Sequence, residues 1–143
     1  MTTVPSDEEF LAYNQGIISE FRAHRGVVSQ IPFPILLLTT TGARSGRSAT
    51  VSLGYAADDG GRVFVVASKA GAPKHPAWFH NLLANPSVTV ELGDRSFAAR
   101  AFVTAGEERD RLYARVSGTG YEKNTDRVFP VIVLDGVPAP GPT

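Results

Sequence analysis

The chain has 143 residues, which suits a single domain built around one hydrophobic core. Its 14 basic and 14 acidic side chains cancel, so no overall field attracts nucleic acid or an anionic membrane, and any anion site must be local. The absence of cysteine excludes disulfide scaffolds, thiolate metal sites and cysteine nucleophiles. The start "MTTVPSDEEFLAYN" lacks the features of a signal peptide, so a cytoplasmic location is expected.

A helix is predicted from residue 7 to about 24. Ser6 and Glu9 have the spacing of a capping box, and four apolar residues then recur with a helical period. These four are Phe10, Ile17, Ile18 and Phe21. Gly26 is the expected stop of this helix.

Six strands are predicted after this helix. They are "ILLLTTTG", "RSATVSLGYAA", "RVFVVAS", "SVTVEL", "SFAARAFV" and "VFPVIVL", within residues 35–134. Gly54 inside the second strand predicts a bulge or a close approach by another group. The "DDGG" run at 58–61 predicts a hairpin into the third strand, and Gly93-Asp94 joins the fourth strand to the fifth.

Two further helices are predicted. Pro76 opens a short one that ends at Asn85-Pro86, and Thr104 with Glu107 has capping-box spacing for another that runs to about Val116. With short turns between most strands, this pattern favours a mainly β protein, an antiparallel barrel or coiled sheet with flanking helices. We expect one domain over 1–143, with a helical segment at 1–27, a β core at 31–135 and a disordered tail at 136–143.

Several common site motifs are missing from the sequence. It has no GxGxxG, GxxxxGK[ST] or GxSxG run, and its three histidines show neither HxxxH nor HExxH spacing. No metal site is therefore expected, and a nucleophilic triad is not supported.

Two basic clusters remain as candidates. Arg44 and Arg47 flank Ser45-Gly46 in a tight turn, and Lys69 and Lys74 follow the third strand in a stretch, residues 61–90, without a single acid. Glycine, serine and cations in a turn can cradle a phosphate through backbone N–H groups and charge. The alternative is that each cluster is an ordinary polar surface turn.

Aromatic residues adjoin the second cluster. Trp78, Phe79 and Leu82 share one short helix, where core packing is expected for Phe79 and Leu82 and a ligand cleft for Trp78. Tyr55 and Tyr121 are either interfacial or able to orient a substrate. Taken together, these residues favour a flat, phosphate-bearing cofactor.

The order and spacing of three segments resemble the deazaflavin-dependent nitroreductase family of actinobacteria. They are "LLLTTTGARSGRSATVSLGY", "DGGRVFVVASKAGAPKHPAWFHNLLANPSVTVEL" and "TDRVFPVIVL", and "ASKAGAPKHPAWFHNL" is the most specific part. The resemblance implies a split β-barrel and the coenzyme F-420, a flavin-like tricycle with a phosphate and an oligoglutamate tail. The reduced coenzyme delivers a hydride to an electron-poor substrate.

The resemblance also assigns roles to positions. Arg44 and Ser45 fall where the family contacts the anionic part of the cofactor, and the strand under the ring carries Thr50, Val51, Ser52 and Tyr55. The segment around ring and phosphate carries Ala67, Ser68 and Lys69, and the helix start beside phosphate and tail carries Ala77, Trp78, Phe79 and Asn81. Arg47 and Lys74 are added for their charge and position.

Tyr121 matches one of the tyrosines on the substrate side. The hydroxyl of Ser68 or Tyr121, or backbone N–H groups, are expected to stabilise the negative charge that develops on the substrate oxygen, with Tyr121 or water as proton donor. Arg115 and Gly118 stand where further tyrosines of the family are expected. Activated alkenes such as enones or unsaturated lactones are therefore as well supported as nitroaromatics.

Two other functions stay open on the sequence. One is an FMN-binding oxidoreductase on the same barrel, and the other is a non-catalytic carrier of a tetrapyrrole or lipid. Open split barrels often pair, which leaves a homodimer open. The mixed charge of the 7–24 helix argues against membrane contact, and the neutral chain argues against nucleic acid.

Overall fold

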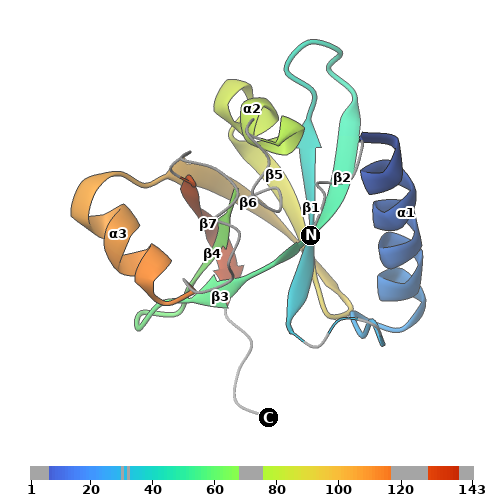
Figure 1. Cartoon of the computed structure of the whole chain (residues 1–143), viewed down its shortest axis with the longest axis horizontal. Helices are drawn as coiled ribbons and strands as arrows, with labels where there is room; N and C mark the ends of the chain where they lie inside the picture. Colours follow the sequence, from blue (N-terminus) through green and yellow to red (C-terminus); the bar gives the residue numbers. More distant parts are fainter. Residues whose placement is uncertain (1–6, 30, 32, 68–75, 117–128, 139–143) are drawn as a thin grey trace, which may run out of the picture.

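The computed structural model describes residues 7–29, 31, 33–67, 76–116 and 129–138, of which residues 7–11 by their backbone alone. Its centre is one antiparallel sheet with the strand order β2-β1-β5-β6-β7-β4-β3 (Figure 1). The strands are β1 (Ile35–Thr41), β2 (Ser48–Gly54), β3 (Ala56–Ala57), β4 (Arg62–Val66), β5 (Ser87–Leu92), β6 (Arg95–Val103) and β7 (Val131–Pro138). The helices are α1 (Asp7–Ala23), α2 (Ala77–Ala84) and α3 (Gly106–Ala114).

The sheet curls because one stretch of chain supplies both of its edges. β2 and β3 stand at opposite ends of the strand order, yet only Tyr55 separates them in the sequence. The prediction of one strand over 47–57 is therefore wrong. At the break, a Cβ on Gly54 would lie 3.1 Å from the ring of Phe33, so the close approach predicted at this glycine is confirmed.

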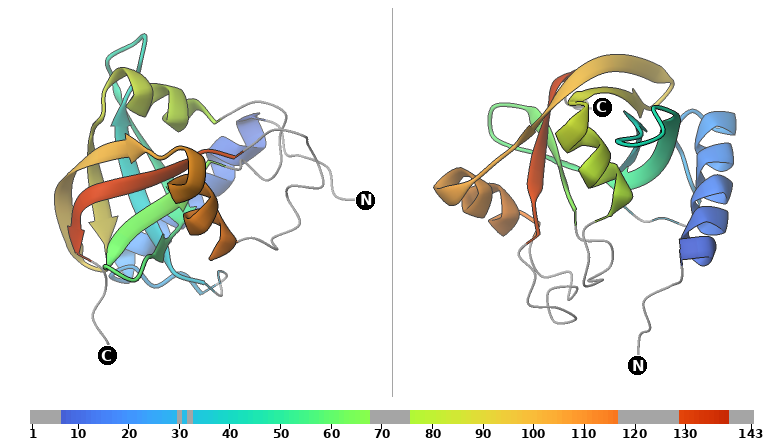
Figure 2. Two further views of the ribbon diagram at one scale, coloured as in Figure 1. Left: turned by 90° about the vertical axis from the view of Figure 1, so that its left-hand side faces the viewer. Right: turned by 90° about the horizontal axis from the view of Figure 1, so that it is seen from above.

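Each helix covers a different part of the sheet (Figure 2). α1 packs Ile17 and Phe21 on Ile35 and Leu37, on the outer face of β1. α3 packs through Leu112 on the outer face of β4 and β7. α2 places its buried residues in the main core, which fills the inside of the curled sheet. The split β-barrel with flanking helices expected from the sequence is confirmed, with seven strands in place of about six.

The end of α1 agrees with its sequence. The helix stops at Ala23, Arg25 and Gly26 take positive φ angles of 55° and 93°, and the Gly26 N–H donates to the Phe21 carbonyl at 2.8 Å. This is the usual left-handed end of a helix. A Cβ on Gly26 would lie 2.7 Å from the Gly93 Cα, so glycine is also needed for the packing of α1 on the β5–β6 turn.

Two predicted boundaries are wrong. Thr104 does not cap α3, which begins at Gly106 with Ala105 at the N-cap. The buried hydroxyl of Thr104 instead donates to the Val131 carbonyl at 2.8 Å. β7 begins at Val131 and reaches Pro138, which pairs with Arg62, so the final strand extends three residues into the predicted tail. Backbone pairing with β4 and β6 outweighs the proline and glycine content of this segment.

The β3–β4 turn carries a carboxylate that we expect to make stability depend on pH. Asp58 Oδ1 accepts hydrogen bonds from the backbone N–H groups of Arg62 and Gly60, and Oδ2 pairs with the Arg62 guanidinium at 2.6 Å. The backbone N–H and the guanidinium of Arg62 lower the pKa of Asp58. A lowered folded-state pKa means that the ionised carboxylate stabilises the fold above its unfolded pKa of about 4, and that this stabilisation disappears as pH falls through the folded pKa.

Asp58→Asn is therefore expected to lower the denaturant midpoint at neutral pH and to match the unchanged chain in acid. Asp59→Asn is the matched control, because the Asp59 side chain is 96% exposed and its ion pair among the described residues is with a surface arginine, Arg115. A deficit for Asp58→Asn of the same size at both pH values would contradict the assignment.

Candidate functional site

The candidate site lies at the end of the sheet where α2 sits, which we call the α2 end (top of Figure 1). The strand registers bring the ends of β1, β4 and β6 and the starts of β2, β5 and β7 to this end. The Ala67 N–H donates to the Pro130 carbonyl at 2.9 Å, just beyond β4 and just before β7. Ala67, which precedes the segment that begins at residue 68, therefore lies close to the residues that follow the segment ending at residue 128. Those segments carry Ser68, Lys69, Lys74 and Tyr121, which lie outside the described residues.

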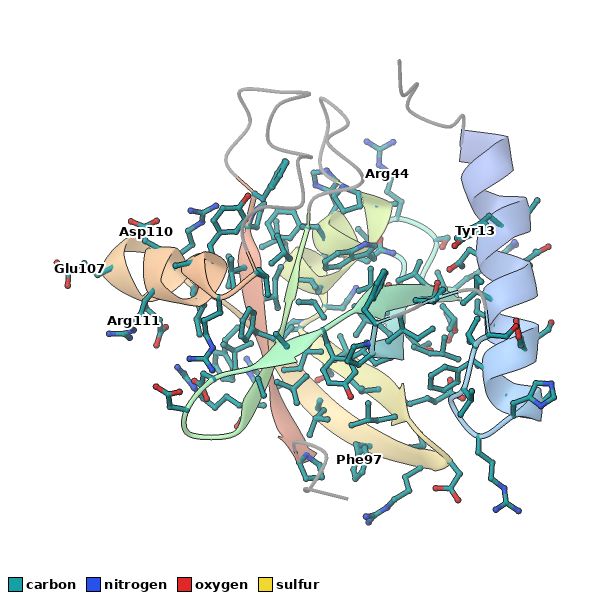
Figure 3. The ribbon with its side chains drawn as sticks, turned by 60° about the horizontal axis from the view of Figure 1, so that its bottom comes forward. Tyr13, Arg44, Phe97, Glu107, Asp110 and Arg111 are labelled. Atoms are coloured by element: carbon teal, nitrogen blue, oxygen red, sulfur yellow. The ribbon has the colours of Figure 1, made fainter. Side chains whose placement is uncertain are left out.

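The β1–β2 turn carries the first basic cluster to the same end. The Gly42 N–H donates to the Arg47 carbonyl at 2.8 Å, and the Arg47 N–H donates to Ser45 Oγ at 3.1 Å. Ser45 thus holds the turn in shape. Arg44 and Arg47 are exposed, and neither guanidinium has a hydrogen bond or ion pair with the described part of the chain. Figure 3 shows Arg44 extending away from the sheet beside α2.

Asn81 connects this turn to α2. Its Oδ1 accepts from the Ala43 N–H at 3.0 Å and its Nδ2 donates to Thr40 Oγ1 at 3.1 Å. Both ends of the amide are therefore occupied within the fold. Asn81 thus joins the Arg44 turn to α2, and its direct contact with the cofactor, expected from the resemblance, stays a prediction.

The start of α2 lies at this end too, and there the Phe79 N–H donates to the Pro76 carbonyl at 3.1 Å. Pro76 occupies the N-cap without a side-chain hydrogen bond, and the first turn, which includes the exposed Ala77, has no acidic residue. An uncapped helix N-terminus favours negative charge. It stands at the same end of the sheet as the Arg44 turn.

The aromatic residues of α2 face the interior. Trp78 and Phe79 are each 7% exposed and Leu82 is 2% exposed, all within the main core. Trp78 therefore packs in the core as Phe79 and Leu82 do, and its contact with the cofactor stays a prediction. An apolar side chain on a short helix over a curled sheet gains more from the core than from the surface. Ala67 is likewise fully buried.

The candidate residues of β2 divide between two faces, as alternation along a strand requires. Val51 and Tyr55 pack on the main core. Thr50 and Ser52 point toward α1: Thr50 Oγ1 lies 2.7 Å from Thr39 Oγ1, and Ser52 Oγ donates to Asn14 Oδ1 at 3.1 Å. These two hydroxyls have partners on the α1 side and Val51 and Tyr55 face the core, so the four residues lie on two faces, and their contact with the cofactor stays a prediction.

Asn14 is a residue that the sequence reasoning missed. Its Nδ2 donates to the Thr50 carbonyl at 2.9 Å and its Oδ1 accepts from the Ser52 N–H at 2.8 Å. The amide thus pairs with the outer edge of β2 as a further strand would. A polar residue among the apolar positions of a predicted helix was the only signal for it.

Burial raises the pKa of the Tyr55 phenol. It therefore stays protonated at neutral pH and is able to donate a hydrogen bond from the point where β2 and β3 meet.

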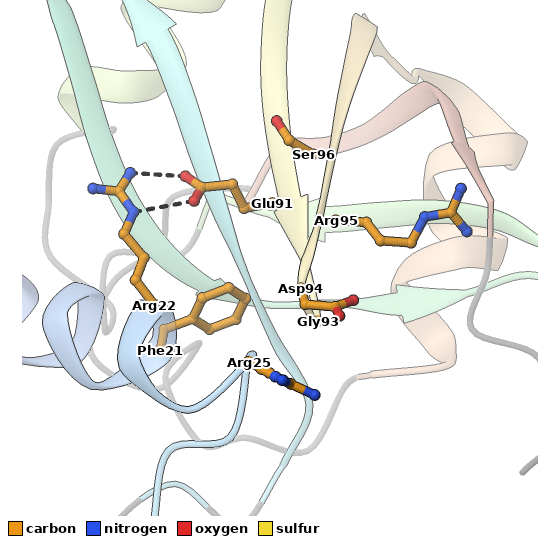
Figure 4. Close-up of a pocket in the computed structure, with 8 residues that line it drawn as sticks. All are labelled: Phe21, Arg22, Arg25, Glu91, Gly93, Asp94, Arg95 and Ser96. Carbon is orange, nitrogen blue, oxygen red and sulfur yellow. Dashed lines mark hydrogen bonds and ion pairs between the residues drawn. The ribbon is translucent and has the colours of Figure 1, made fainter.

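A cavity of about 190 Å³ lies at the opposite end, between the end of α1 and the β5–β6 turn (Figure 4). Arg22 pairs there with both oxygens of Glu91 at 3.0 and 2.8 Å, and Arg95 extends away from that pair. The C-terminal end of a helix disfavours anions. None of the residues expected to bind a cofactor lines this cavity.

Among the described residues, neither a metal site nor a membrane-spanning helix is found. These residues contain no group of three histidine, cysteine or acidic side chains placed to hold a metal ion. None of the helices within them combines the length and the apolar character that a membrane span requires.

Comparison with known proteins gives consistent results. The model of the family "F420H(2)-dependent quinone reductase" matches residues 16–136. The F420H(2)-dependent quinone reductase Rv1261c of Mycobacterium tuberculosis is 41% identical over 109 residues, which cover 71% of this chain and 72% of that protein. A solved F420-H2 dependent reductase, FDR-A, is 40% identical with a TM-score of 0.62, over 71% of this chain and 94% of that one. Another solved structure, described as a domain-swapped dimer, is 34% identical with a TM-score of 0.64, over 91% and 100%.

Fold and similarity together define a split-barrel oxidoreductase that uses a deazaflavin cofactor. The chain belongs to the F420H(2)-dependent quinone reductase family. This confirms the family resemblance, the class of enzyme and the cofactor, coenzyme F-420, that the sequence predicted.

Proposed function

We propose that the chain transfers a hydride from reduced F-420 to a small electron-poor carbonyl compound, a quinone or an enone, at the α2 end of its sheet. One observation supports the proposal: the Arg44 turn, the uncapped start of α2 and the hydrogen-bonded residues Ala67 and Pro130 all lie at this end of the sheet. Ala67 and Pro130 adjoin the two further segments that carry site residues. Nitroaromatics are a second substrate class, supported by the resemblance alone.

The described residues fit the cofactor by their charge. The coenzyme has a phosphate and an acidic tail, and Arg44 and Arg47 present two exposed guanidinium groups that lack described partners. Backbone N–H groups at the start of α2 complement them. FMN has one phosphate and no acidic tail, so it would leave one of the basic clusters without a purpose.

When bound, the reduced coenzyme supplies the hydride, so the protein has to bind, orient and exclude water. We assign the anionic part to Arg44, Arg47, Lys69 and Lys74, with Ser45 holding the turn and Ala77 giving a backbone N–H. Val51 and Tyr55, which reach the inner face of the barrel, contribute to the surface near the ring. Trp78, Phe79 and Ala67 shape the site from behind as core, and Thr50, Ser52 and Asn81 fix the backbone around it.

Tyr121 and Ser68 complete the proposed machinery. A hydroxyl that donates a hydrogen bond to the substrate oxygen stabilises the charge that develops there during hydride transfer. Tyr121 or water then supplies the proton. Both assignments rest on the family resemblance.

A homodimer in the cytoplasm is part of the same proposal. The 34% identical solved structure that is described as a domain-swapped dimer supports the dimer, and light scattering of the purified chain tests it.

The function is tested by titrating the protein with oxidised F-420 and, in parallel, with FMN. The chain has a single tryptophan, Trp78, whose burial in α2 near the proposed site makes its emission a second signal beside that of the ligand. We expect saturable binding of F-420 with a Kd of about 1 μM or lower and much weaker binding of FMN. Equal binding of both, or binding of neither, would refute the cofactor site proposed at the α2 end.

A further inference from the structure

Arg109 of α3 makes an unusual set of contacts. Its side chain is only 16% exposed. Nε and Nη2 both donate to one carbonyl oxygen, that of Phe129, at 3.1 and 2.7 Å. The guanidinium carbon lies 4.5 Å from the centre of the Tyr113 ring, and Asp110, its acidic partner at 3.1 Å, is 72% exposed.

The same stretch of chain is fixed at three consecutive carbonyls. That of Phe129 accepts from Arg109, that of Pro130 from the Ala67 N–H at 2.9 Å, and that of Val131 from the Thr104 N–H and hydroxyl at 3.0 and 2.8 Å. The Phe129 ring is 2% exposed and meets Tyr113 edge-on at 6.3 Å. The backbone at residues 129–131 is therefore held from three sides: by α3, by the end of β4 and by the β6–α3 junction.

The location of this stretch gives it a functional meaning. Residue 129 is the first described residue after the segment that carries Tyr121, and residue 67 is the last described residue before the segment that carries Ser68 and Lys69. Resting on the function proposed above, we infer that Arg109 is a positioning residue for the reaction. It fixes Phe129 and, through the Pro130–Ala67 hydrogen bond, helps to keep Phe129 beside Ala67, the two described residues that adjoin the segments with Tyr121 and with Ser68 and Lys69.

Lysine cannot take over this role. Only a guanidinium directs two N–H groups to one acceptor while its flat face lies on an aromatic ring, and an ammonium is a compact charge that holds its water more strongly. The nearly buried charge of Arg109 is compensated mainly by carbonyl and ring contacts. Such an arrangement is costly unless its geometry is kept.

The test compares the purified full chain with its Arg109→Lys variant. Turnover is measured with reduced F-420 and a soluble benzoquinone or cyclohexenone, and the Kd for oxidised F-420 is measured separately. We expect kcat/KM to fall about 10- to 100-fold, because a mutation far from the reacting atoms that shifts the groups around them by a small distance slows the reaction by that order. The Kd for F-420 should change by less than about threefold, because the Arg44 turn is held independently by Asn81.

A second variant separates positioning from folding. Arg109→Ala opens space where methylguanidinium can bind, and added methylguanidinium is expected to restore part of kcat/KM. Arg111→Lys on the same helix is the control, because Arg111 is exposed. Arg109→Lys with kcat/KM within about twofold of the unchanged chain would overturn the inference, even if the thermal midpoint fell. If the unchanged chain neither binds F-420 nor reduces either compound, the proposed function falls first, and this role with it.

Discussion

Trp78→Ala is expected to lower the free energy of unfolding by about 3–5 kcal/mol, a large share of the roughly 5–15 kcal/mol that stabilises a typical domain. The reason is that Trp78 is 7% exposed and packs with Phe79 and Leu82 in the main core. Removing the indole leaves a cavity between α2 and the sheet that the surrounding strands cannot close. Denaturant unfolding followed by far-UV circular dichroism measures the loss.

Leu83→Ala is the matched control on the same helix, because Leu83 is 55% exposed and should cost little. A Trp78→Ala variant that unfolds at the original midpoint but binds F-420 weakly would show instead that the indole contacts the cofactor. Loss of stability together with loss of binding is the result that the structure predicts, since α2 carries both Asn81 and the uncapped helix start.

Local patterns in the sequence predicted most helices and strands of this fold. Apolar alternation and turn residues located the strands, and Gly26 and Gly54 stand where backbones or rings approach closely. The division at Tyr55 was not readable, because each half forms a hairpin with its own neighbour in the sequence, β1 or β4, and the sequence does not show that these two strands lie far apart in the sheet. Thr104 was misread because a threonine that bonds a strand carbonyl and one that caps a helix look alike in sequence.

The candidate site was predicted less completely than the fold. Charge and glycine content indicated the Arg44 turn, whose guanidinium groups are indeed exposed and lack described partners. Side-chain amides that join distant segments leave no periodic signal, so the tethers made by Asn14 and Asn81 emerged only from the structure. Arg109 was hidden for the same reason, since its carbonyl partner lies 20 residues further along the chain.

The second large effect concerns cofactor affinity, and two variants are expected to lose it for different reasons. Replacing Arg44 and Lys69 together with alanine removes two cations from the proposed site for an acidic tail. Each charged hydrogen bond contributes about 1.5–3 kcal/mol, so we expect the Kd for F-420 to rise about 100-fold or more at low salt. At 1 M salt the Debye length shrinks to about 3 Å, and the deficit should fall to a small fraction of that value.

Asn81→Ala removes no charge. It frees the Ala43 N–H and Thr40 Oγ1, so the Arg44 turn loses its connection to α2 while both cations remain. Its loss of affinity should therefore be smaller and nearly independent of salt, because what is lost is the fixed position of the turn. Fluorescence titrations of both variants at low and high salt decide between charge and geometry. If the Arg44 and Lys69 variant kept its full deficit at 1 M salt, these residues would act through structure, and the electrostatic site proposed for the anionic tail would have to be placed elsewhere.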